Sequence, residues 1–481
     1  MIDPRLVALA RVTPVDGTAY DARTVREAVR TVARQLGWSG PEDGASAFAG
    51  LVPKGARVLV KPNLVLHRNH GPWGIEPLFT HPVLIRAVVE ELLLTEASQV
   101  IVGDAPLQEC DFGELLRASG MDQWAPELER RDPRFHGPRD YRRTKTSFEG
   151  GLRVEREGLL PVDRFVLYDL QRDSLLEPIT KPGEFRVTQY PPAELARTHA
   201  PGRHQYLVAR DIIEADVVIN LPKLKTHKKA GITNALKNLI GINGNKEFLP
   251  HHRLGGSGDG GDCYPGDDAV KRALEFVYDR TNSTRSIMAR RLYRLGTRAL
   301  QRMLHAKGDK LGVEGSWSGN DTIWRTCLDL NRILLYGTPD GRVVDDRQRT
   351  VVHLVDGVVA GHGDGPLRAE PLPLGLLLAG STAAAVDLVG ARLLGYAPER
   401  IPIVAHAFDR FRWPLTDFAR EDVRVTGARG DGPAAERVQA DFGSTEMHWP
   451  AGWRDAVDAA IPPDAGRALS VADVDLTPTD A

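Results

Sequence analysis

Short apolar runs that end in polar or glycine-bearing turns recur along the chain. Residues 58–60 and 100–102 are such runs, and their length and branched side chains predict buried strands. Between them, apolar positions three and four apart over residues 82–93 predict a helix that begins at Thr80 or His81. Strand, helix and strand in this order indicate a βαβ unit of a parallel sheet.

The same texture continues further along the chain. Residues 216–221 form the clearest buried run, and 351–356 and 375–379 are further predicted strands. Helical spacing is found over residues 321–336 and 382–395. We therefore expect an α/β fold with a mostly parallel sheet or sheets, flanking helices and βαβ units, interrupted by an insertion of loop and helix.

Less regular segments divide the chain. Residues 164–168 and 205–209 predict edge or antiparallel strands. A glycine-rich loop over residues 251–266 opens the insertion. The predicted parts are an N-terminal α/β part over 1–250, a loop and basic-helix insertion over 251–320, a C-terminal α/β part over 321–423, and an acidic, Pro/Ala-rich tail over 424–481.

The insertion contains a basic amphipathic helix over residues 286–307. Ile287, Leu292, Leu295 and Ala299 share one face, and arginines cover the other. One interpretation is a solvated helix that packs on the core. The other is a surface that meets anionic lipid or a partner protein.

Composition narrows the class of protein. The chain has 481 residues, 42% of them hydrophobic and 26% charged, with a net charge of -2, which predicts a soluble globular protein and argues against a dedicated nucleic-acid binder. Its three cysteines are far apart, so no iron–sulfur cluster is expected. The first residues lack a signal-peptide pattern, and no apolar run is long enough for a transmembrane segment. A cytoplasmic location is predicted.

The segment 222–241, PKLKTHKKAGITNALKNLIG, is the strongest candidate for chemistry. It is expected to be a polar loop at the end of the 216–221 strand, followed by a helix over 233–240. Lys223, Lys225 and His227 would gather near a helix N-terminus, where backbone N–H groups favour an anion.

Two interpretations of this segment stay open. The first is an anionic substrate or cofactor site in which His227 is an acid/base and Lys225 acts with it, because a histidine titrates near neutral pH. Thr226 and Asn238 would add polar contacts to the substrate. The second is a solvated basic loop.

Lys237 is a separate candidate, because it lies among apolar neighbours in the expected helix. A lysine in such surroundings either extends its ammonium group to solvent or is kept for a purpose such as covalent attachment.

Two further strand ends carry polar residues. Lys61 and Asn63 follow the 58–60 strand, and Asp104 follows the 100–102 strand. Parallel neighbours would place them at one edge of the sheet, where ligands usually bind. Lys61 and Asn63 would orient a carboxylate or hydroxyl, and Asp104 would bind a metal or accept a hydrogen bond. Capping of the loops is the alternative.

Metal ligands are a further interpretation of several loops. His251 and His252 are adjacent, so that only one of them would ligate a given ion together with distant partners. Asp356 and Asp364 lie in the glycine-rich segment DGVVAGHGDGP. Loop histidines and ordinary turn residues are the alternatives.

Trp317 lies between small residues in GSWSGND. It would form a stacking face for a sugar or another flat ligand, or else be a core tryptophan.

Several of these motifs occur together and in order. Val60-Lys61-Pro62-Asn63, Val102-Gly103-Asp104, the 222–241 segment, Asp356-Gly357 with GHGDGP, and Ala385-Val386-Asp387 resemble the family called domain of unknown function 362 over roughly residues 55–405. Some members carry a ferredoxin-like cysteine cluster, which this chain lacks.

A more distant likeness concerns the pattern His227-x2-Ala230-Gly231-x5-Lys237. It is similar to a stretch of the nickel-pincer lactate racemase family. The resemblance implies that His227 is an acid/base, that Lys237 anchors a cofactor, and that His251 or His252 ligates nickel. The chain has Asn234-Ala235-Leu236 where the racemases have Gly-Gly-Arg, which puts the tethering of that cofactor in question.

Three functions follow from these residues. The first is an isomerase-like enzyme, a racemase or epimerase with a divalent metal such as nickel, acting on a small polar or anionic substrate. The second is a magnesium-dependent enzyme of another class, with Asp104, Asp356 and Asp364 around the ion. The third is a non-catalytic protein that binds an anion or a carrier.

Overall fold

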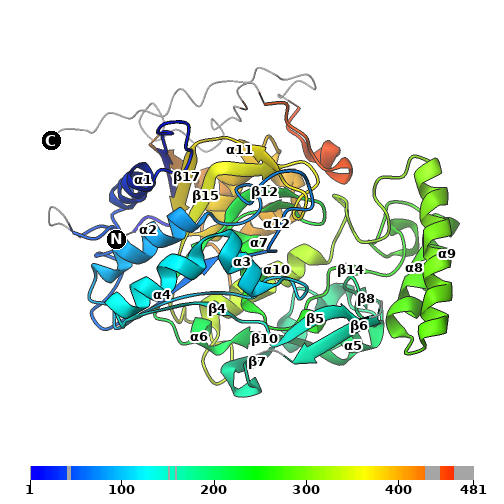
Figure 1. Ribbon diagram of the computed structural model, residues 1–481. Coiled ribbons are helices and arrows are strands. Elements are labelled where there is room, and N and C mark those ends of the chain that lie inside the picture. Colours follow the sequence, from blue (N-terminus) through cyan, green and yellow to red (C-terminus); the bar gives the residue numbers. More distant parts are fainter. Residues whose placement is uncertain are drawn as a thin grey trace.

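The structure is a computed structural model that describes residues 2–40, 45–149, 152–157, 160–427, 442 and 445–459 (Figure 1). The predicted tail lies largely outside these residues. Its described parts are packed, with the indole of Trp453 buried in the core.

One mixed sheet of 11 strands organises the chain. Its main path runs β18 (Arg424–Thr426), β1 (Leu6–Arg11), β17 (Leu376–Gly380), β15 (Thr350–His362), β11 (Val217–Leu221), β2 (Arg57–Pro62), β3 (Gln99–Asp104) and β4 (Phe135–Asp140). Beside this path, β12 (Lys223–His227) pairs with β15 and β13 (Gly231–Thr233), and β16 (Glu370–Leu372) pairs with β15. The α/β class is confirmed.

The predicted buried runs become the centre of the sheet. Strands β15, β11, β2, β3 and β4 are parallel to one another. Asn220 is level with Lys61, and Val60 with Val102, so these strands end at the same edge. Lys61, Asn63 and Asp104 therefore gather there, as the βαβ pattern predicts.

Helices cover both faces of the sheet (Figure 1). One apolar core lies under α1 (Ala22–Gln35), α2 (Pro82–Leu93), α3 (Phe112–Ala118) and α4 (Met121–Arg131). A second lies under α7 (Ala235–Asn238), α10 (Ile323–Tyr336), α11 (Ala383–Leu393) and α12 (Pro402–Ala405). The predicted start of α2 is confirmed, because the His81 ring accepts a hydrogen bond from the amide of Val83.

Smaller sheets lie outside the main one. They are β7 (Phe165–Asp169), β10 (Arg203–Ala209) and β9 (His199–Ala200); β14 (His252–Arg253) with β8 (Phe185–Arg186); and β5 (Thr144–Glu149) with β6 (Leu152–Glu157). Short helices α5 (Pro192–Thr198) and α6 (Arg210–Ile213) flank β10. β7 and β10 are antiparallel, as predicted.

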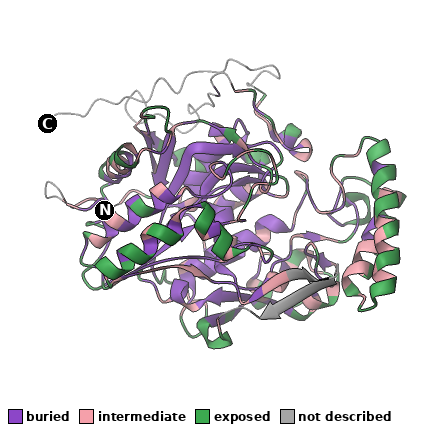
Figure 2. Cartoon of the chain, viewed as in Figure 1, coloured by how far each residue is buried: buried purple, intermediate pink, exposed green. Residues whose placement is uncertain are grey.

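The insertion contains a helical hairpin of α8 (Ala269–Ser283) and α9 (Ile287–Ala306). The hairpin stands at one side of the molecule (Figure 1), and the outer side of α9 is largely exposed (Figure 2). The predicted basic helix is confirmed within one residue at each end.

The predicted loop after β11 is wrong. Residues 223–233 form a buried antiparallel hairpin of β12 and β13, which we call the lysine hairpin. Gly231 has a φ of +79°, and a Cβ there would lie 2.8 Å from the Trp453 ring, so the turn requires glycine. The predicted helix over 233–240 is reduced to α7 and the 3₁₀ helix η4 (Leu239–Ile242). Lysine content suggested a solvated loop, but Lys223, Lys225 and Lys229 donate hydrogen bonds to partners inside the protein, and Lys228 at the turn is exposed.

Candidate anion-binding site

A cavity of about 570 Å³ opens at the carboxyl edge of β2 and β3. Its wall contains eight predicted site residues: Lys61, Asn63, Asp104, His227, Lys237, Asn238, His251 and Asp364. Segments far apart in sequence thus meet at one place, where the ends of β2 and β3 and the 222–241 segment line the same cavity.

Positive charge dominates the wall of this cavity. Lysines at five positions line it, together with Arg368: Lys61, Lys228, Lys229, Lys237 and Lys246. Four carboxylates also reach it, but Asp104 is paired with Lys61 at 2.7 Å, and Glu314 lies 3.8 Å from Lys229. An anion is the complementary ligand.

Lys61 braces the floor of the cavity. Besides Asp104, its Nζ donates to the carbonyl of Pro62 at 2.9 Å and to Asn238 Oδ1 at 3.2 Å. Burial lowers the pKa of Lys61 and raises that of Asp104, while each charge opposes the shift of the other. A Cβ at Gly241 would lie 2.3 Å from Asp104 Oδ1, so this glycine leaves room for the pair.

Lys237 differs from Lys61 because its ammonium group has no hydrogen bond or ion pair to any part of the chain that the structure describes. The side chain is 7% exposed and lines the cavity. Burial lowers its pKa, and the charges of Lys229 and Lys61 lower it further. Lys237 is thus a buried cation available to a ligand.

The ring of His227 has a fixed hydrogen-bonding state. Its Nδ1 accepts hydrogen bonds from the amides of Lys229 at 3.0 Å and Ala230 at 3.2 Å, so Nδ1 carries no proton. Burial, followed by the charges of Lys237 and Lys225, lowers the pKa of His227 well below 6.5. The neutral ring therefore has its proton on Nε2 and acts as a hydrogen-bond donor there.

His251 has the opposite arrangement. Its Nδ1 lies 2.7 Å from the carbonyl of Leu249, and only a protonated nitrogen can donate to a carbonyl. Burial and the charges of Lys229 and Lys237 lower its pKa well below 6.5. The Nε2 of the neutral ring thus carries a free lone pair, which suits a base.

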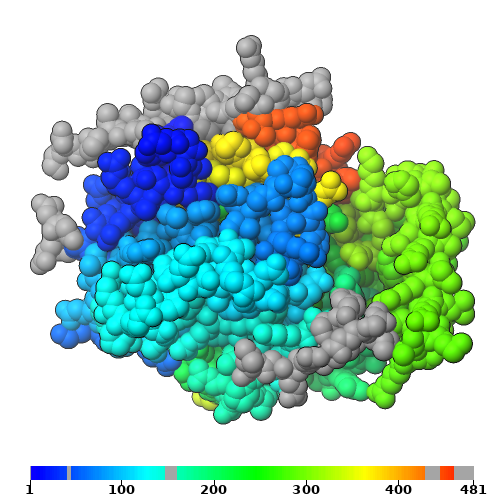
Figure 3. Space-filling view, in the orientation of Figure 1, coloured from blue at the N-terminus to red at the C-terminus, as the bar shows by residue number. Residues whose placement is uncertain are grey.

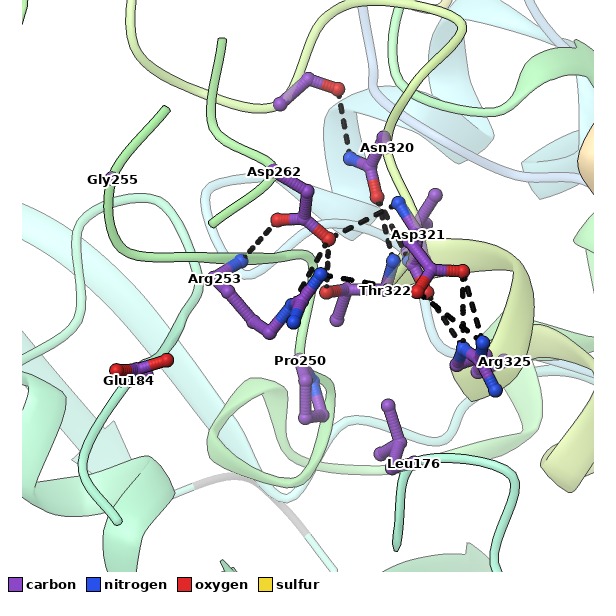
Figure 4. A network of polar contacts seen from close by, with 12 residues as sticks. Leu176, Glu184, Pro250, Arg253, Gly255, Asp262, Asn320, Asp321, Thr322 and Arg325 are labelled. Carbon is purple, nitrogen blue, oxygen red and sulfur yellow. Dashed lines mark hydrogen bonds and ion pairs between the residues drawn. The ribbon is translucent and has the colours of Figure 1, made fainter. Parts of the chain in front are cut away.

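A polar network of Asp262, Asn320 and Thr322 (Figure 4) lies next to the His251 segment and holds it in place. Asn320 Nδ2 donates to the backbone carbonyl of His251 at 2.9 Å, and its Oδ1 accepts from the amide of Thr322 at 3.0 Å. Asp262 accepts from Thr322 Oγ1 at 2.6 Å and from the amide of Arg253. The start of α10 and the loop of the insertion therefore position His251 together.

Six predicted residues lie outside the cavity wall, and four of them lie on β12 and its neighbour β15. Lys223 is fully buried and paired with Asp356 at 2.6 Å, which also accepts from Tyr20. Lys225 Nζ donates to the carbonyl of Leu78, and Thr226 Oγ1 donates to that of Gly363 at 2.8 Å. These residues hold β12 against its neighbours.

His252 and Trp317 also lie apart from this cavity. His252 lines a neighbouring cavity of about 330 Å³, which shares Val187, Thr188, Gln189 and Glu314 with the first. Trp317 Nε1 donates to the carbonyl of Asp262 at 2.9 Å, so its ring belongs to the scaffold of the insertion.

The predicted metal ligands do not gather around one point. Within the described residues, one group of three ligand-bearing side chains lies close enough for a metal, and it consists of His362, Glu370 and His448. The Nδ1 of His362 already accepts from the amide of His448 at 3.1 Å. At the cavity, the Nε2 of His251 belongs to no group of three such ligand atoms among the described residues and lies among lysine ammonium groups, an arrangement that fits neither nickel nor magnesium.

Sequence reasoning missed several residues of the wall. Lys246 carries charge, but nothing in its spacing marks it as a ligand. Lys229 belongs to the charge expected of the 222–241 segment, without a role of its own. Thr233 Oγ1 and the predicted Asn63 Oδ1 are buried without a hydrogen-bond partner among the described residues and belong to residues of the wall. The sequence shows Thr233 as a polar residue of the 222–241 segment but does not show that its hydroxyl faces the cavity.

Most of the chain matches one protein-family model. Residues 58–152 and 179–392 match the model described as "Domain of unknown function (DUF362)". The chain belongs to the DUF362 family. The match includes β2, β3, the lysine hairpin and α11, so the whole floor of the cavity lies in the family domain.

Two individual proteins resemble this DUF362 chain. The thylakoid-associated protein sll1697 of Synechocystis sp. (strain ATCC 27184 / PCC 6803 / Kazusa) is 23% identical over 390 residues, which are 80% of this chain and 75% of that protein. A crystal structure of a protein from Thermotoga maritima aligns with a TM-score of 0.30 and 11% identity, over 73% of this chain. The match spans about half, 54%, of that protein.

None of the helices in the described ranges combines the length and apolar character needed to cross a bilayer.

Proposed function

We propose that the cavity binds a small anionic substrate and moves a proton at its hydroxyl-bearing carbon, next to a carboxylate. The reaction is isomerase-like, a racemisation or an epimerisation. One observation carries this proposal: His227 offers an N–H and His251 a lone pair to the same lysine-rich cavity.

Substrate binding rests on charge and on unused polar atoms. The ammonium group of Lys237 receives the carboxylate, because charge-assisted hydrogen bonds are stronger than neutral ones. Thr233 Oγ1 and Asn63 Oδ1 supply a donor and an acceptor for the hydroxyl group. The buried pair of Lys61 and Asp104 keeps the floor rigid.

Proton transfer needs a base, a stabilised anion and an acid. His251 Nε2 takes the proton from carbon, and negative charge moves onto the carboxylate oxygens. The N–H of His227 donates to these oxygens, as preorganised donors do at a developing oxyanion. Lys237, whose pKa is lowered by burial, returns a proton to the carbon from the ammonium group. His251 then releases its proton to water and the Lys237 amine takes one up, which restores both groups. Return to the opposite face inverts the centre.

Hydrogen exchange tests the reaction. The full chain is incubated in D₂O with lactate, malate, mandelate or gluconate, and the proton on the hydroxyl-bearing carbon is followed by NMR. We expect the signal of one of them to decline, and His251→Gln to slow the decline by at least about 100-fold, the scale of a lost general base.

A surface histidine provides the control. His136→Gln removes a ring at the far end of the sheet, outside the cavity wall, and should exchange like the parent protein. Exchange that persists at the parent rate in His251→Gln would refute the assignment of the base.

Binding without turnover is the second candidate, since Lys237 alone suffices to attract an anion. Calorimetric titration with the same four acids separates the two functions. If one acid binds, Lys237→Met abolishes binding and no exchange accompanies it, the site is a receptor for an anion or a carrier and the enzyme proposal falls.

A further inference from the structure

Helix α9 presents an unusual exposed surface. Of the ten large hydrophobic residues that are exposed in the described chain, five lie on this one helix: Ile287, Met288, Leu292, Leu295 and Met303. Met288 is 82% exposed and Leu292 67%. On the surfaces of soluble proteins, large exposed hydrophobic residues occur singly. A cluster of them on one helix therefore indicates a contact surface.

The exposed residues form two parallel lines along α9. At 100° per residue, Met288, Leu292, Leu295, Ala299 and Met303 fall on one line, the apolar ridge. Arg291, Arg298 and Arg302 fall beside it on a second line, the arginine row. Both lines are exposed, and together they run the length of the 20-residue helix.

The inner face of α9 explains this orientation. Leu304 is buried, and Tyr278 of α8 accepts a hydrogen bond from Gln301 at 2.8 Å. Leu300 packs in the small apolar core that the hairpin shares with Leu274. The helix is thus held by the side opposite the apolar ridge, and Leu292 and Leu295 do not pack on the core.

The charge of this surface is uncompensated. No aspartate or glutamate occurs from residue 280 to residue 308. In the described part of the chain, no hydrogen bond or ion pair engages the side chains of the arginine row. Figure 3 shows the hairpin as the outer edge of the molecule, where the row can face a partner of negative charge.

We infer that α9 docks on the surface of an anionic lipid bilayer, lying flat with the apolar ridge at the level of the acyl chains. Basic residues beside an apolar line are typical of helices that bind membranes in this way. A protein partner is less suited, because protein interfaces centre on aromatic anchors, and the two lines contain none. This inference is independent of the reaction proposed for the cavity.

Vesicle sedimentation tests the inference with the full chain. Vesicles of phosphatidylcholine with roughly a quarter phosphatidylglycerol should sediment the protein, and vesicles of phosphatidylcholine alone should not, because the attraction is to anionic lipid. Raising the salt should release the protein, since exposed charges are screened.

Two variants and a matched control sharpen the result. R291Q/R298Q/R302Q should weaken binding on the order of 100-fold, from three lost contacts with the anionic surface, and L292S/L295S should abolish it. R23Q/R130Q/R131Q removes three exposed arginines elsewhere and should bind like the parent protein.

Two outcomes would overturn the inference. One is equal binding of the parent protein and R291Q/R298Q/R302Q to the anionic vesicles. The other is absence of vesicle binding together with a concentration-dependent dimer, lost in L292S/L295S, by sedimentation velocity; the ridge would then contact a second copy. Circular dichroism of each variant verifies that the exposed substitutions leave the fold intact.

Discussion

The lysine hairpin and α9 are both rich in basic residues, yet they treat charge in opposite ways. Lys223 and Lys225 are fully buried, and burial lowers the pKa of both. The arginine row of α9 is exposed. A lysine can lose its proton when it is buried, whereas an arginine stays charged. The comparison teaches that a run of basic residues has no single meaning: buried lysines shape a site and exposed arginines present a surface.

The largest effect is expected from the buried pair of Lys223 and Asp356 in the lysine hairpin and β15. Substituting Lys223→Met leaves the Asp356 carboxylate buried without its cation, and we expect a loss of about 3–5 kcal/mol in the free energy of unfolding. Denaturant unfolding followed by circular dichroism measures it.

A double variant is the matched control for that pair. K223M/D356N removes both charges and should recover part of the loss. A single variant as stable as the parent protein would mean that the pair is already neutral in the folded state.

The pH dependence of stability provides a second test. Burial lowers the pKa of His353 to about 3, against about 6.5 in the unfolded chain. The folded state thus binds fewer protons, so the stability from this group is complete above pH 6.5 and is lost as the pH falls toward 3. Between pH 6.5 and 5 the loss is about 2 kcal/mol.

His353→Gln isolates this contribution, because glutamine can still accept the hydrogen bond that Asn220 Nδ2 makes with His353 Nδ1 at 3.0 Å. The free energy of unfolding of the variant should fall less steeply between pH 6.5 and 5. If the free energy of unfolding of the variant fell as steeply with pH as that of the parent protein, other buried histidines would be responsible for the pH dependence.

The smallest effect compares Lys237, which follows the lysine hairpin in α7, with one residue of α9. Lys237→Met removes a buried ammonium group that has no partner among the described residues, and it should raise the free energy of unfolding by about 1 kcal/mol, since an unpaired buried charge is costly. Arg298→Met on α9 should change it by less than about 0.5 kcal/mol. Denaturant midpoints of the two variants measure the difference, and a destabilised Lys237→Met would show that this lysine has a structural partner.

Local pattern predicted the fold where each element carries its own signal. The runs that became β2, β3 and β11 are apolar on both faces, as central parallel strands must be, and α2 and α9 follow helical spacing. The lysine hairpin could not be predicted in this way. Its strand β12 is stabilised by β15, more than 120 residues later in the chain, and by acceptors such as Asp356 and the carbonyl of Leu78.

The site residues likewise divide into those that the sequence could predict and those that it could not. Lys61 and Asp104 were predictable, because each follows a strand whose direction the βαβ pattern sets. The different protonation of His227 and His251 was not, because it depends on the backbone groups of Lys229, Ala230 and Leu249 that face each ring. Asp356 is adjacent to the same edge, but its carboxylate turns to Lys223 and Tyr20.

Trp453 has a consequence for the order in which the protein is made. Its Nε1 donates to the carbonyl of Lys228 at 2.6 Å, across a separation of 225 residues. A chain leaves the ribosome from its N-terminus. The turn between β12 and β13 therefore lacks its contact with Trp453 until the 225 residues that separate the two have been translated. Until the indole arrives, a nascent chain exposes an apolar, lysine-rich hairpin, a surface that chaperones for unfinished proteins would recognise.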